Sequence, residues 1–488
     1  MIKKRIFIIV TTFLFGHIIS VAQSSVQSSD TLKRQINLVE SNLAGSVRTT
    51  DQKPWTIQER MAFYKVPGVT VAVIRNYKLA WAKGYGWADV AAKIPVTEKT
   101  LFQAASVSKS LNAVGVLKLV QEGKIDPDKD INYYLKSWKY PYDSVSKGNI
   151  INIKHLLSHT GGISVHGFGG YSVTDSLPTI VQVLNGTKPA NSERIRSLTA
   201  PGAKFDYSGG GVTVSQLILT DITGQPYDTY MYKNVLKPMG MDNSSFTQQP
   251  AKNRAALLAT AYSADGSEVK GKYHIYPEQG AAGLWTNPTD LSKYIIETQL
   301  AYEGKSARVL NQQTTKLRLT PYLTGGALGV FIDSLADGVY FQHSGGNEGF
   351  KCQYYGSLQG GNGVVVMINS DNAGIIGEIV NSVGKVYGFK GLNRSKVYTE
   401  VAVDAAVLQT YVGEYEMKPG FILTVTREGN KLFAQGTGQD KIGLFAEAQN
   451  KFFLKNIPVE LEFIKNNKNE VITCRVFQGG VIDAKRIK

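Results

Sequence analysis

The sequence predicts an α+β protein in which an antiparallel sheet, flanked by helices and carrying an inserted, mainly helical subdomain, precedes a small antiparallel β domain. Three observations support this fold class. Residues 68–86 have the pattern of a β-hairpin, and several short β-rich segments follow one another within residues 326–369, with helical stretches between the two regions. From about residue 405 the pattern changes to short alternating strands joined by turns, without a substantial helix.

The composition excludes several other classes of protein. The chain has 488 residues, of which 43% are hydrophobic and 19% charged, so a disordered chain is excluded and one large domain plus a smaller module fits the length. No collagen, heptad or solenoid repeat is present. The only two cysteines, Cys352 and Cys474, are too few for a disulfide framework and lack zinc-type spacing, although a single bridge between them stays open.

The N-terminus has the pattern of a secretory signal peptide, which we place at residues 1–22. A basic start at residues 3–5 precedes the apolar run Ile6–Ile19 and a small-residue end, so cleavage is expected after Ala22. The apolar run is too short to span a bilayer, and no later segment is long and apolar enough. We therefore expect a secreted or periplasmic protein without a stable membrane anchor, beginning with a helix and linker at residues 23–52.

The basic charge does not indicate a nucleic-acid partner. The formal charge of +15 falls to +12 when the three basic residues of the signal peptide are removed, because residues 1–22 contain no Asp or Glu. The remaining Lys and Arg are dispersed and no groove-reading motif is present. This balance favours solubility and attraction to anionic envelope polymers.

Two strands and two helices are expected between residues 68 and 159. Residues 68–74 and 79–86 predict two antiparallel strands joined by a turn. Ser106–Glu122 predicts an amphipathic helix, because its apolar residues lie close to the 3.6-residue period and Gly123 stands where a C-cap belongs. A short helix is expected at residues 152–159.

The second half of the larger domain is expected to supply two helices and the remaining strands of the sheet. Asn287, Pro288 and Asp290 open a helix, since Asn caps, Pro suits the first turn and Asp complements the helix dipole. A helix at residues 375–387 is expected to cover one face. Four further antiparallel strands are expected at residues 326–333, 339–343, 352–356 and 363–369.

The C-terminal region is expected to be a linker at residues 391–404 and a separate small β domain at residues 405–488. It contains no histidine and no visible pairing of a nucleophile with a base, so binding, oligomerisation or covering a cleft is favoured over chemistry. The predicted strands are residues 423–427, 431–435, 451–454, 461–464 and 471–477.

The chemistry is predicted at the start of the helix after the first hairpin. Ser106 and Lys109 lie three residues apart, about 4.5 Å along a helix axis and on nearly one face, so their side-chain tips can meet. A serine hydroxyl needs a base, and a desolvated lysine can serve once burial and the helix dipole lower its pKa by about 3 units. Since Ser-x-x-Lys also occurs by chance, further motifs have to support it.

Two further segments extend this pattern. Tyr207 lies between a Pro- and Gly-containing loop and an apolar helical run, where its phenol can carry a proton or simply belong to the core. Later, His343 is followed by the small residues Ser344, Gly345 and Gly346, which would let a substrate backbone lie against a strand.

These motifs, in this order, resemble those of the serine β-lactamase and penicillin-binding superfamily. The branch most similar contains class C β-lactamases, D-alanyl-D-alanine carboxypeptidases, D-aminopeptidases and related esterases. Residues 155–162 and 283–291 are also similar to that family. The resemblance covers roughly residues 60–390 and implies a β-lactamase/transpeptidase-like serine hydrolase domain, which we place at residues 53–390. Residues 405–488 resemble the small β domain often appended to these hydrolases.

The resemblance implies a role for each matching residue. Ser106 would be the acylated nucleophile, Lys109 its activating partner, and Tyr207 the base that takes the Ser106 proton and returns it to the leaving group. Backbone N–H groups of Ser106 and Gly346 would form the oxyanion hole, each worth about 3 kcal/mol. Which of Lys109 and Tyr207 removes the proton is left open. The expected substrate-binding residues are Gly209, His343, Ser344, Gly345 and Gly346.

Two departures from the family pattern shape the expected activity. Gly209 stands where the family has an Asn that contacts the amide of an acylated substrate, and His343 stands where β-lactamases have Lys. Since a neutral His grips a carboxylate less strongly than Lys does, peptidase or esterase activity is favoured over β-lactam hydrolysis.

The sequence therefore predicts an exported serine hydrolase that cleaves a small peptide, amide or ester through a Ser106 acyl-enzyme, without metal or organic cofactor. A peptidase of the D-Ala-D-Ala carboxypeptidase or D-aminopeptidase type is favoured, with peptidoglycan among the candidate partners. An esterase, a class C-like β-lactamase and a penicillin- or peptidoglycan-binding receptor without turnover are the alternatives. His155 and His159 have metal-ligand spacing, but Leu156 stands where the metalloprotease motif has Glu.

Overall fold

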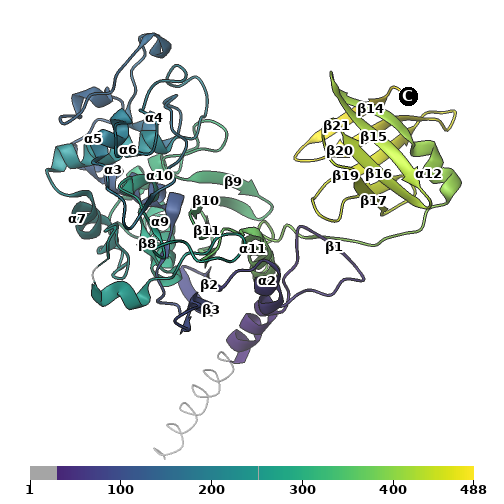
Figure 1. The fold of residues 1–488 in the computed structure, drawn as a ribbon, viewed down its shortest axis with the longest axis horizontal. Helices are drawn as coiled ribbons and strands as arrows, with labels where there is room; N and C mark the ends of the chain where they lie inside the picture. Colours follow the sequence, from purple (N-terminus) through teal and green to yellow (C-terminus); the bar gives the residue numbers. More distant parts are fainter. Residues whose placement is uncertain (1–29, 251) are drawn as a thin grey trace, which may run out of the picture. The chain divides into compact units, whose positions relative to one another are not determined.

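The computed structural model describes residues 30–250 and 252–488 (Figure 1). The predicted signal peptide lies outside the described residues. The chain divides into two compact units: the larger comprises Gln58–Val380 and Phe389–Leu392, and the smaller comprises Asn381–Gly388, Asn393–Lys488 and the chain before Gln58.

The larger unit is built on a seven-stranded, fully antiparallel sheet in the order β4-β3-β2-β12-β11-β10-β9, so the first hairpin pairs with a strand from much later in the chain (Figure 1). Its strands lie close to the predicted positions, except that residues 326–330 contribute only an isolated bridge from Gly326 to Phe331. The strands are β2 (Gly68–Arg75), β3 (Lys78–Asp89), β4 (Ile94–Pro95), β9 (Phe331–Leu335), β10 (Gly338–Asn347), β11 (Phe350–Ser357) and β12 (Gly363–Ile368).

The centre of this sheet is covered on both faces. Strands β2 and β12 are buried at every position except Arg75, so their side chains meet packed elements on each side. Helix α9 (Pro288–Tyr302) packs against β2, β3, β11 and β12. Helices α2 (Ile57–Phe63) and α11 (Gly374–Tyr387) lie side by side and are joined by the buried ion pair of Arg60 and Glu378 (Figure 1).

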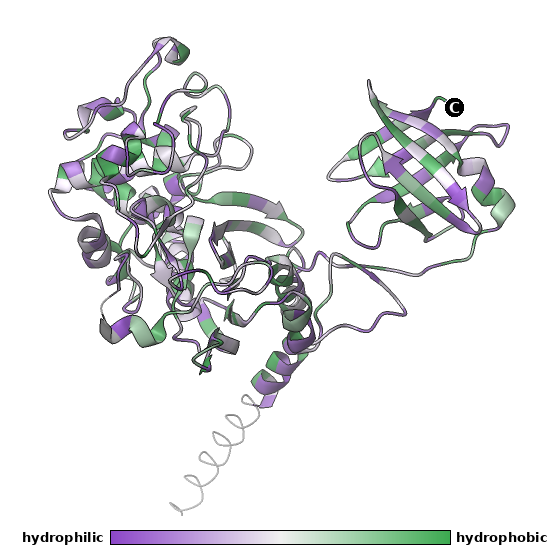
Figure 2. Ribbon diagram, viewed as in Figure 1, coloured by the Kyte–Doolittle hydropathy of each residue, from purple (hydrophilic) through white to green (hydrophobic). Residues whose placement is uncertain are grey.

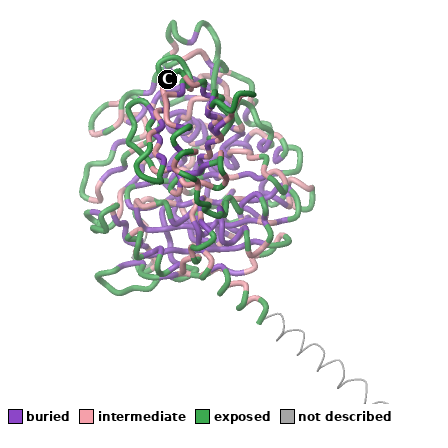
Figure 3. Tube along the Cα trace, turned by 90° about the vertical axis from the view of Figure 1, so that its right-hand side faces the viewer, coloured by how far each residue is buried: buried purple, intermediate pink, exposed green. Residues whose placement is uncertain are grey.

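The other helices of this unit gather around α3 and α6, which contact each other and share one apolar core with the sheet. Figure 3 shows the buried stretches in purple and the exposed loops in green. Helix α3 is not amphipathic as predicted, because Ser108–Leu117 is buried at every position and its polar residues bond inside the core. The elements are η1 (Ala105–Val107), α3 (Ser108–Gln121), α4 (Ile153–Leu157), α5 (Ile180–Asn185), α6 (Gly209–Thr223), α7 (Tyr227–Met231), α8 (Gln279–Ala282) and α10 (Gln312–Arg318).

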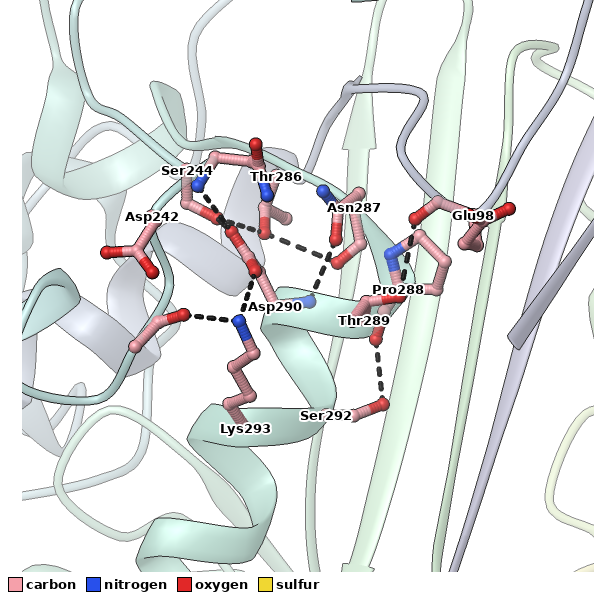
Figure 4. A network of polar contacts seen from close by, with 12 residues as sticks. Glu98, Asp242, Ser244, Thr286, Asn287, Pro288, Thr289, Asp290, Ser292 and Lys293 are labelled. Carbon is pink, nitrogen blue, oxygen red and sulfur yellow. Dashed lines mark hydrogen bonds and ion pairs between the residues drawn. The ribbon is translucent and has the colours of Figure 1, made fainter. Parts of the chain in front are cut away.

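A network of polar contacts holds the start of α9 (Figure 4). Asn287 caps the helix by accepting a hydrogen bond from the backbone N–H of Asp290 at 2.8 Å, which confirms the predicted helix start. The buried Asp290 carboxylate accepts a bond from Ser244 Oγ at 3.0 Å, and Ser244 Oγ lies 2.7 Å from Thr286 Oγ1. The network therefore fixes strand β8 (Trp285–Thr286) as well as the helix.

The smaller unit contains a closed barrel of eight antiparallel strands. Hydrophobic and hydrophilic residues alternate along these strands, as expected when one face lines the interior (Figure 2). The predicted strands are present, and three further strands, β14, β17 and β21, close the barrel. The strands are β14 (Gly413–Lys418), β15 (Phe421–Glu428), β16 (Lys431–Gly436), β17 (Ile442–Ala446), β18 (Lys451–Phe453), β19 (Glu460–Lys465), β20 (Val471–Phe477) and β21 (Val481–Arg486).

The barrel interior is filled by side chains rather than open. Phe452, Phe463 and Tyr415 are buried together with Cys474. No substantial helix was predicted here, and one short helix, α12 (Ala405–Tyr411), precedes the first strand and adds its buried Leu408 and Tyr411 to this core. Both cysteines of the chain are free thiols.

The smaller unit also includes residues 30–40, which are helical as predicted, and a parallel pair formed by β1 (Val47–Thr49) and β13 (Lys396–Tyr398). Every helix in residues 30–250 and 252–488 falls short of the length and hydrophobicity that a membrane span requires.

Candidate active site

The candidate nucleophile stands at the start of the buried helix α3. Ser106 lies in the turn η1, and the Nζ of Lys109 donates hydrogen bonds to Ser106 Oγ at 2.9 Å and to the Ala281 carbonyl at 2.8 Å. Ala105 has a φ of +48°, a left-handed conformation that strains an alanine. The chain turns sharply here, which leaves Ser106 partly exposed while Lys109 is only 2% exposed.

A short pairing supports the backbone before the serine. Strand β5 (Phe102–Gln103) pairs with β8, and the N–H of Ala104 donates to the carbonyl of Leu284 at 2.8 Å. Because the network at the start of α9 fixes β8, it also fixes the backbone from which Ser106 projects. The family-like motif at residues 283–291 therefore supports the site rather than supplying a reacting group.

Lys109 is buried without an opposite charge. Among the described residues no carboxylate forms an ion pair with it, and burial lowers the pKa of its ammonium group to about 7. A substantial fraction of the amine is therefore uncharged at neutral pH. An uncharged amine in contact with a serine hydroxyl can accept its proton.

Tyr207 is enclosed by rings and by the lysine. Its ring centroid lies 5.1 Å from Lys109 Nζ, 4.3 Å from the His159 ring and 6.4 Å from the Phe331 ring, which is nearly parallel to it. Burial raises the pKa of the Tyr207 phenol to about 12, although a hydrogen bond with Ser106 lowers it in part. The phenol therefore keeps its proton at neutral pH, which makes it a better proton donor than base in the resting site.

The third motif lies on a free strand edge. Strand β9 pairs with β10 only as far as Gln342, so residues 343–347 present an unpaired edge. Glycine is required at position 345, because a Cβ there would lie 2.3 Å from the Ala104 carbonyl. This close approach brings the strand against the turn that carries Ser106.

The side chains of this edge alternate between the two faces of the sheet. His343 and Gly345 are buried, whereas Ser344 and Gly346 are exposed. An extended substrate could pair with the free edge as an added strand does. The oxyanion hole formed by the N–H groups of Ser106 and Gly346 stays a prediction.

His343 is neutral in this environment. Burial and the nearby Lys109 lower its pKa to about 3, although Nδ1, 2.6 Å from the Ser344 carbonyl, acts in the opposite direction. Nδ1 must carry the hydrogen to bond that carbonyl, which leaves Nε2 as an acceptor without a hydrogen-bond partner among the described residues. The His343 and Tyr207 ring centroids are 6.3 Å apart. His343 thus offers an acceptor, not a positive charge.

A loop takes the place of the missing family Asn. The N–H of Gly209 donates to the His166 carbonyl at 3.0 Å, and a Cβ at position 209 would lie 3.0 Å from that carbonyl and 3.1 Å from the Phe168 ring. The loop at residues 164–171 therefore packs against the start of α6.

Sequence reasoning missed two ring contacts. The sequence indicates for His159 only a spacing typical of metal ligands and a place in a family-like motif. In the structure its Nδ1 accepts a bond from the Ser208 N–H at 3.2 Å, and its ring lies against Tyr207. The exposed His166 ring lies 4.8 Å from Tyr207. His155 instead accepts a hydrogen bond from the backbone N–H of Asn152, the N-cap of α4, at 3.4 Å. In the described chain no three His, Cys, Asp or Glu side chains converge as a metal site would require.

Comparisons with known sequences agree with this architecture. A family model described as Beta-lactamase matches residues 56–374, and a model described as a domain of unknown function (DUF3471) matches residues 399–485. Protein flp of Staphylococcus aureus (strain MRSA252) is 27% identical over 310 residues, which cover 62% of this chain and 60% of that protein. The chain therefore spans only 60% of the length of this curated relative. The putative penicillin-binding protein PbpX of Bacillus subtilis (strain 168) is 26% identical over 318 residues, covering 64% of this chain and 73% of that protein.

Solved structures share the fold. An octameric penicillin-binding protein homologue from Pyrococcus abyssi has a TM-score of 0.59 at 21% identity, covering 88% of this chain and 98% of that chain. The D-amino acid amidase from Ochrobactrum anthropi SV3, complexed with L-phenylalanine amide, has a TM-score of 0.56 at 18% identity, covering 73% of this chain and 99% of that chain.

Proposed function

This chain belongs to the beta-lactamase family of serine hydrolases, and on that premise we propose that it cleaves an amide or ester through an acyl-enzyme on Ser106. The observation that carries the proposal is the 2.9 Å contact between Lys109 Nζ and Ser106 Oγ, made by an amine whose pKa burial lowers to about 7. A nucleophile and its base in hydrogen-bond contact are the minimum that acyl transfer by serine requires.

In the first step Ser106 Oγ forms a bond to the substrate carbonyl carbon. The hydroxyl proton passes to the uncharged Lys109 amine, and the carbonyl oxygen becomes an oxyanion held by the N–H groups of Ser106 and Gly346. The Tyr207 phenol then donates its proton to the departing amine or alcohol as the scissile bond breaks. The Lys109 ammonium restores the phenol, and water releases the acyl group by the reverse sequence.

The leaving side of the substrate is proposed to be uncharged. A terminal carboxylate, as in D-Ala-D-Ala peptides and β-lactams, would meet a neutral His343 whose unpaired Nε2 is an acceptor. Two acceptors facing each other repel rather than bind. An amidase or aminopeptidase acting on D-amino-acid substrates is therefore favoured over a D-Ala-D-Ala carboxypeptidase, and an esterase is the second candidate.

We further propose that the protein acts outside the cytoplasm, secreted or periplasmic, on small peptides, amides or esters that include envelope peptides from peptidoglycan. The predicted signal peptide and the dispersed positive charge support this location. Neither nucleic acid nor a bilayer is proposed as a partner.

The test is a substrate panel with the protein beginning at Gln23. D-amino acid amides, D-Ala-D-Ala peptides, short-chain p-nitrophenyl esters and nitrocefin are compared for the unmodified chain and Ser106→Ala. Steady-state turnover of amides or esters that Ser106→Ala lacks supports the proposal. A single stoichiometric burst would instead indicate a receptor, rapid nitrocefin hydrolysis a β-lactamase, and equal turnover by Ser106→Ala a different nucleophile.

A further inference from the structure

A buried carboxylate near the catalytic groups has no role in the proposed chemistry. Glu278 has an exposed fraction of 0%, and neither of its carboxylate oxygens has a hydrogen-bond partner in the described part of the chain. Burial raises the pKa of this carboxyl to about 7, although the backbone N–H of Glu278 itself acts in the opposite direction. A buried polar group without a partner is costly, so its retention needs a reason.

The backbone around Glu278 is rigidly tied to the site. Glu278 directly precedes α8, and its carbonyl accepts bonds from Ala281 N–H at 3.0 Å and Ala282 N–H at 2.9 Å. The Ala281 carbonyl in turn accepts the bond from Lys109. From α6, Gln216 accepts a bond from the Gly280 N–H at 2.8 Å and donates one to the Pro277 carbonyl at 3.1 Å. The backbone on both sides of Glu278 is therefore fixed by hydrogen bonds.

The surroundings of Glu278 connect it with the loop at residues 164–171. Burial, and to a lesser degree the Glu278 charge, raise the pKa of Tyr171 at the end of that loop and of Tyr276 beside it. Gly170 lies against Tyr276, since a Cβ there would be 2.6 Å from the ring. The same loop brings His166 to Tyr207 and Phe168 to Gly209. The loop at residues 164–171 thus lies against Tyr207, Gly209 and Tyr276.

Part of this loop lies at the protein surface. Gly167 and Gly169 have open space where a Cβ would stand, and His166, Gly167 and Gly169 are exposed. Displacing the loop would break the hydrogen bonds that tie the carbonyls of His166, Gly169 and Gly170 to Gly209, His274 and Asn191. It would give a ligand access to Glu278 from the side on which the family's Asn meets the acyl portion of a substrate.

We propose that Glu278 is the anionic end of an acyl-side subsite, and that it binds a primary ammonium group on the portion of the substrate that becomes attached to Ser106. No cationic side chain in residues 30–250 and 252–488 pairs with this carboxylate, so we infer that the ligand supplies the opposite charge. This inference rests on the proposed function and specifies its substrate class: amino-bearing acyl groups with an uncharged leaving group.

The experiment compares two series of p-nitroanilides. Glycyl, β-alanyl and 4-aminobutyryl anilides carry an ammonium group at increasing distance from the scissile carbonyl, and propionyl, butyryl and pentanoyl anilides replace that group by methyl. At least one ammonium substrate is expected to exceed its methyl counterpart in kcat/KM by about tenfold, the equivalent of 1.4 kcal/mol. Glu278→Gln is expected to abolish this ratio mainly through KM, while the exposed Glu268→Gln keeps it.

The outcomes separate the two levels of the proposal. Hydrolysis of both series without an ammonium preference, or a preference that Glu278→Gln retains, overturns the Glu278 subsite and leaves the serine hydrolase standing. Hydrolysis of neither series overturns the Glu278 subsite, and it overturns the serine hydrolase as well if the amide and ester panel also shows no turnover that depends on Ser106. A measurement on the unmodified chain avoids any folding defect: n-butylammonium should inhibit hydrolysis of the best neutral substrate competitively, whereas n-pentanol should inhibit about tenfold less. Equal inhibition by the two would mean that Glu278 has a purely structural role.

Discussion

The larger unit buries titratable side chains that have no opposite charge beside them among the residues described, whereas the barrel keeps its charged side chains at the surface. In the larger unit Lys109, His343 and Glu278 are buried, and for none of them does a described residue supply an opposite charge. In the barrel the interior is apolar and aromatic, and charged residues lie outside in pairs such as Arg475 with Asp483. The barrel has the arrangement that stabilises a fold, whereas the larger unit keeps groups in protonation states that water would not allow.

The largest effect expected from this contrast is on Lys109. Lys109→Met should lower kcat/KM by about 10³-fold or more, because Ser106 loses its base. The same change should raise Tm at pH 6. The pKa of this amine is depressed from 10.5 to about 7 in the folded protein, so its contribution to stability is complete above pH 10.5 and is lost as pH falls through 7. Thermal melts at pH 6 and pH 9 with activity assays measure both effects.

Ser106→Ala is the matched control for that prediction. It should lose activity equally while keeping the pH-dependent stability, because Lys109 remains buried. A drop in Tm for Lys109→Met at pH 6, relative to the unmodified chain, would contradict the claim that burying the charged amine destabilises the folded protein.

In the barrel the largest effect should be on stability. Phe463 stacks on Tyr411 with centroids 4.4 Å apart and is 1% exposed, so Phe463→Ala should cost about 3–5 kcal/mol by leaving a cavity. Hydrogen exchange should become faster across residues 413–486. Ile482→Ala, on the same barrel but 39% exposed, should leave exchange nearly unchanged. Equal effects of the two substitutions would show that the interior is not packed as described.

A smaller effect on activity is expected from Tyr207→Phe. The ring is retained between His159 and Phe331, so folding should be preserved, but the leaving group loses its proton donor. We expect kcat for an amide to fall by about 10²-fold. An activated ester, whose leaving group needs less protonation, should lose much less. Equal losses for amide and ester would argue against a donor role for the phenol.

The smallest effect is expected at the barrel surface. Asp483→Asn removes one partner of the exposed Arg475 pair, and pairs of this kind contribute little in salt. Tm in 0.15 M salt should not change measurably. A clear loss of stability would mean that the surface pairs, and not the apolar interior, hold the barrel together.

The sequence predicted those features that follow from local patterns. The capped start of α9, the first hairpin, the sheet strands and the Ser106–Lys109 spacing all depend on residues close in the chain, and each lies near its predicted position. The order of the motifs along the chain indicated the family, and the family indicated the fold of the larger unit.

Features that depend on packing from distant segments were not predicted. Helix α3 has an apolar periodicity but is surrounded on all sides, so its polar residues are internal. The positions of His166 and Phe168 depend on a loop whose conformation no local pattern specifies, and Glu278 carries no motif. The barrel closes through pairing of β14 with β21, strands at opposite ends of the domain sequence, and no local pattern specifies that pairing.

The central claim is that an uncharged Lys109 activates Ser106, and the pH dependence of acylation tests it most directly. The rate at which a fluorophosphonate probe labels Ser106 is measured from pH 5 to pH 11, with the modified residue identified by peptide mass spectrometry. We predict that labelling at Ser106 rises with an apparent pKa near 7 and then levels off. Labelling that continues to rise toward pH 10.5, or that occurs on another residue, would contradict the account.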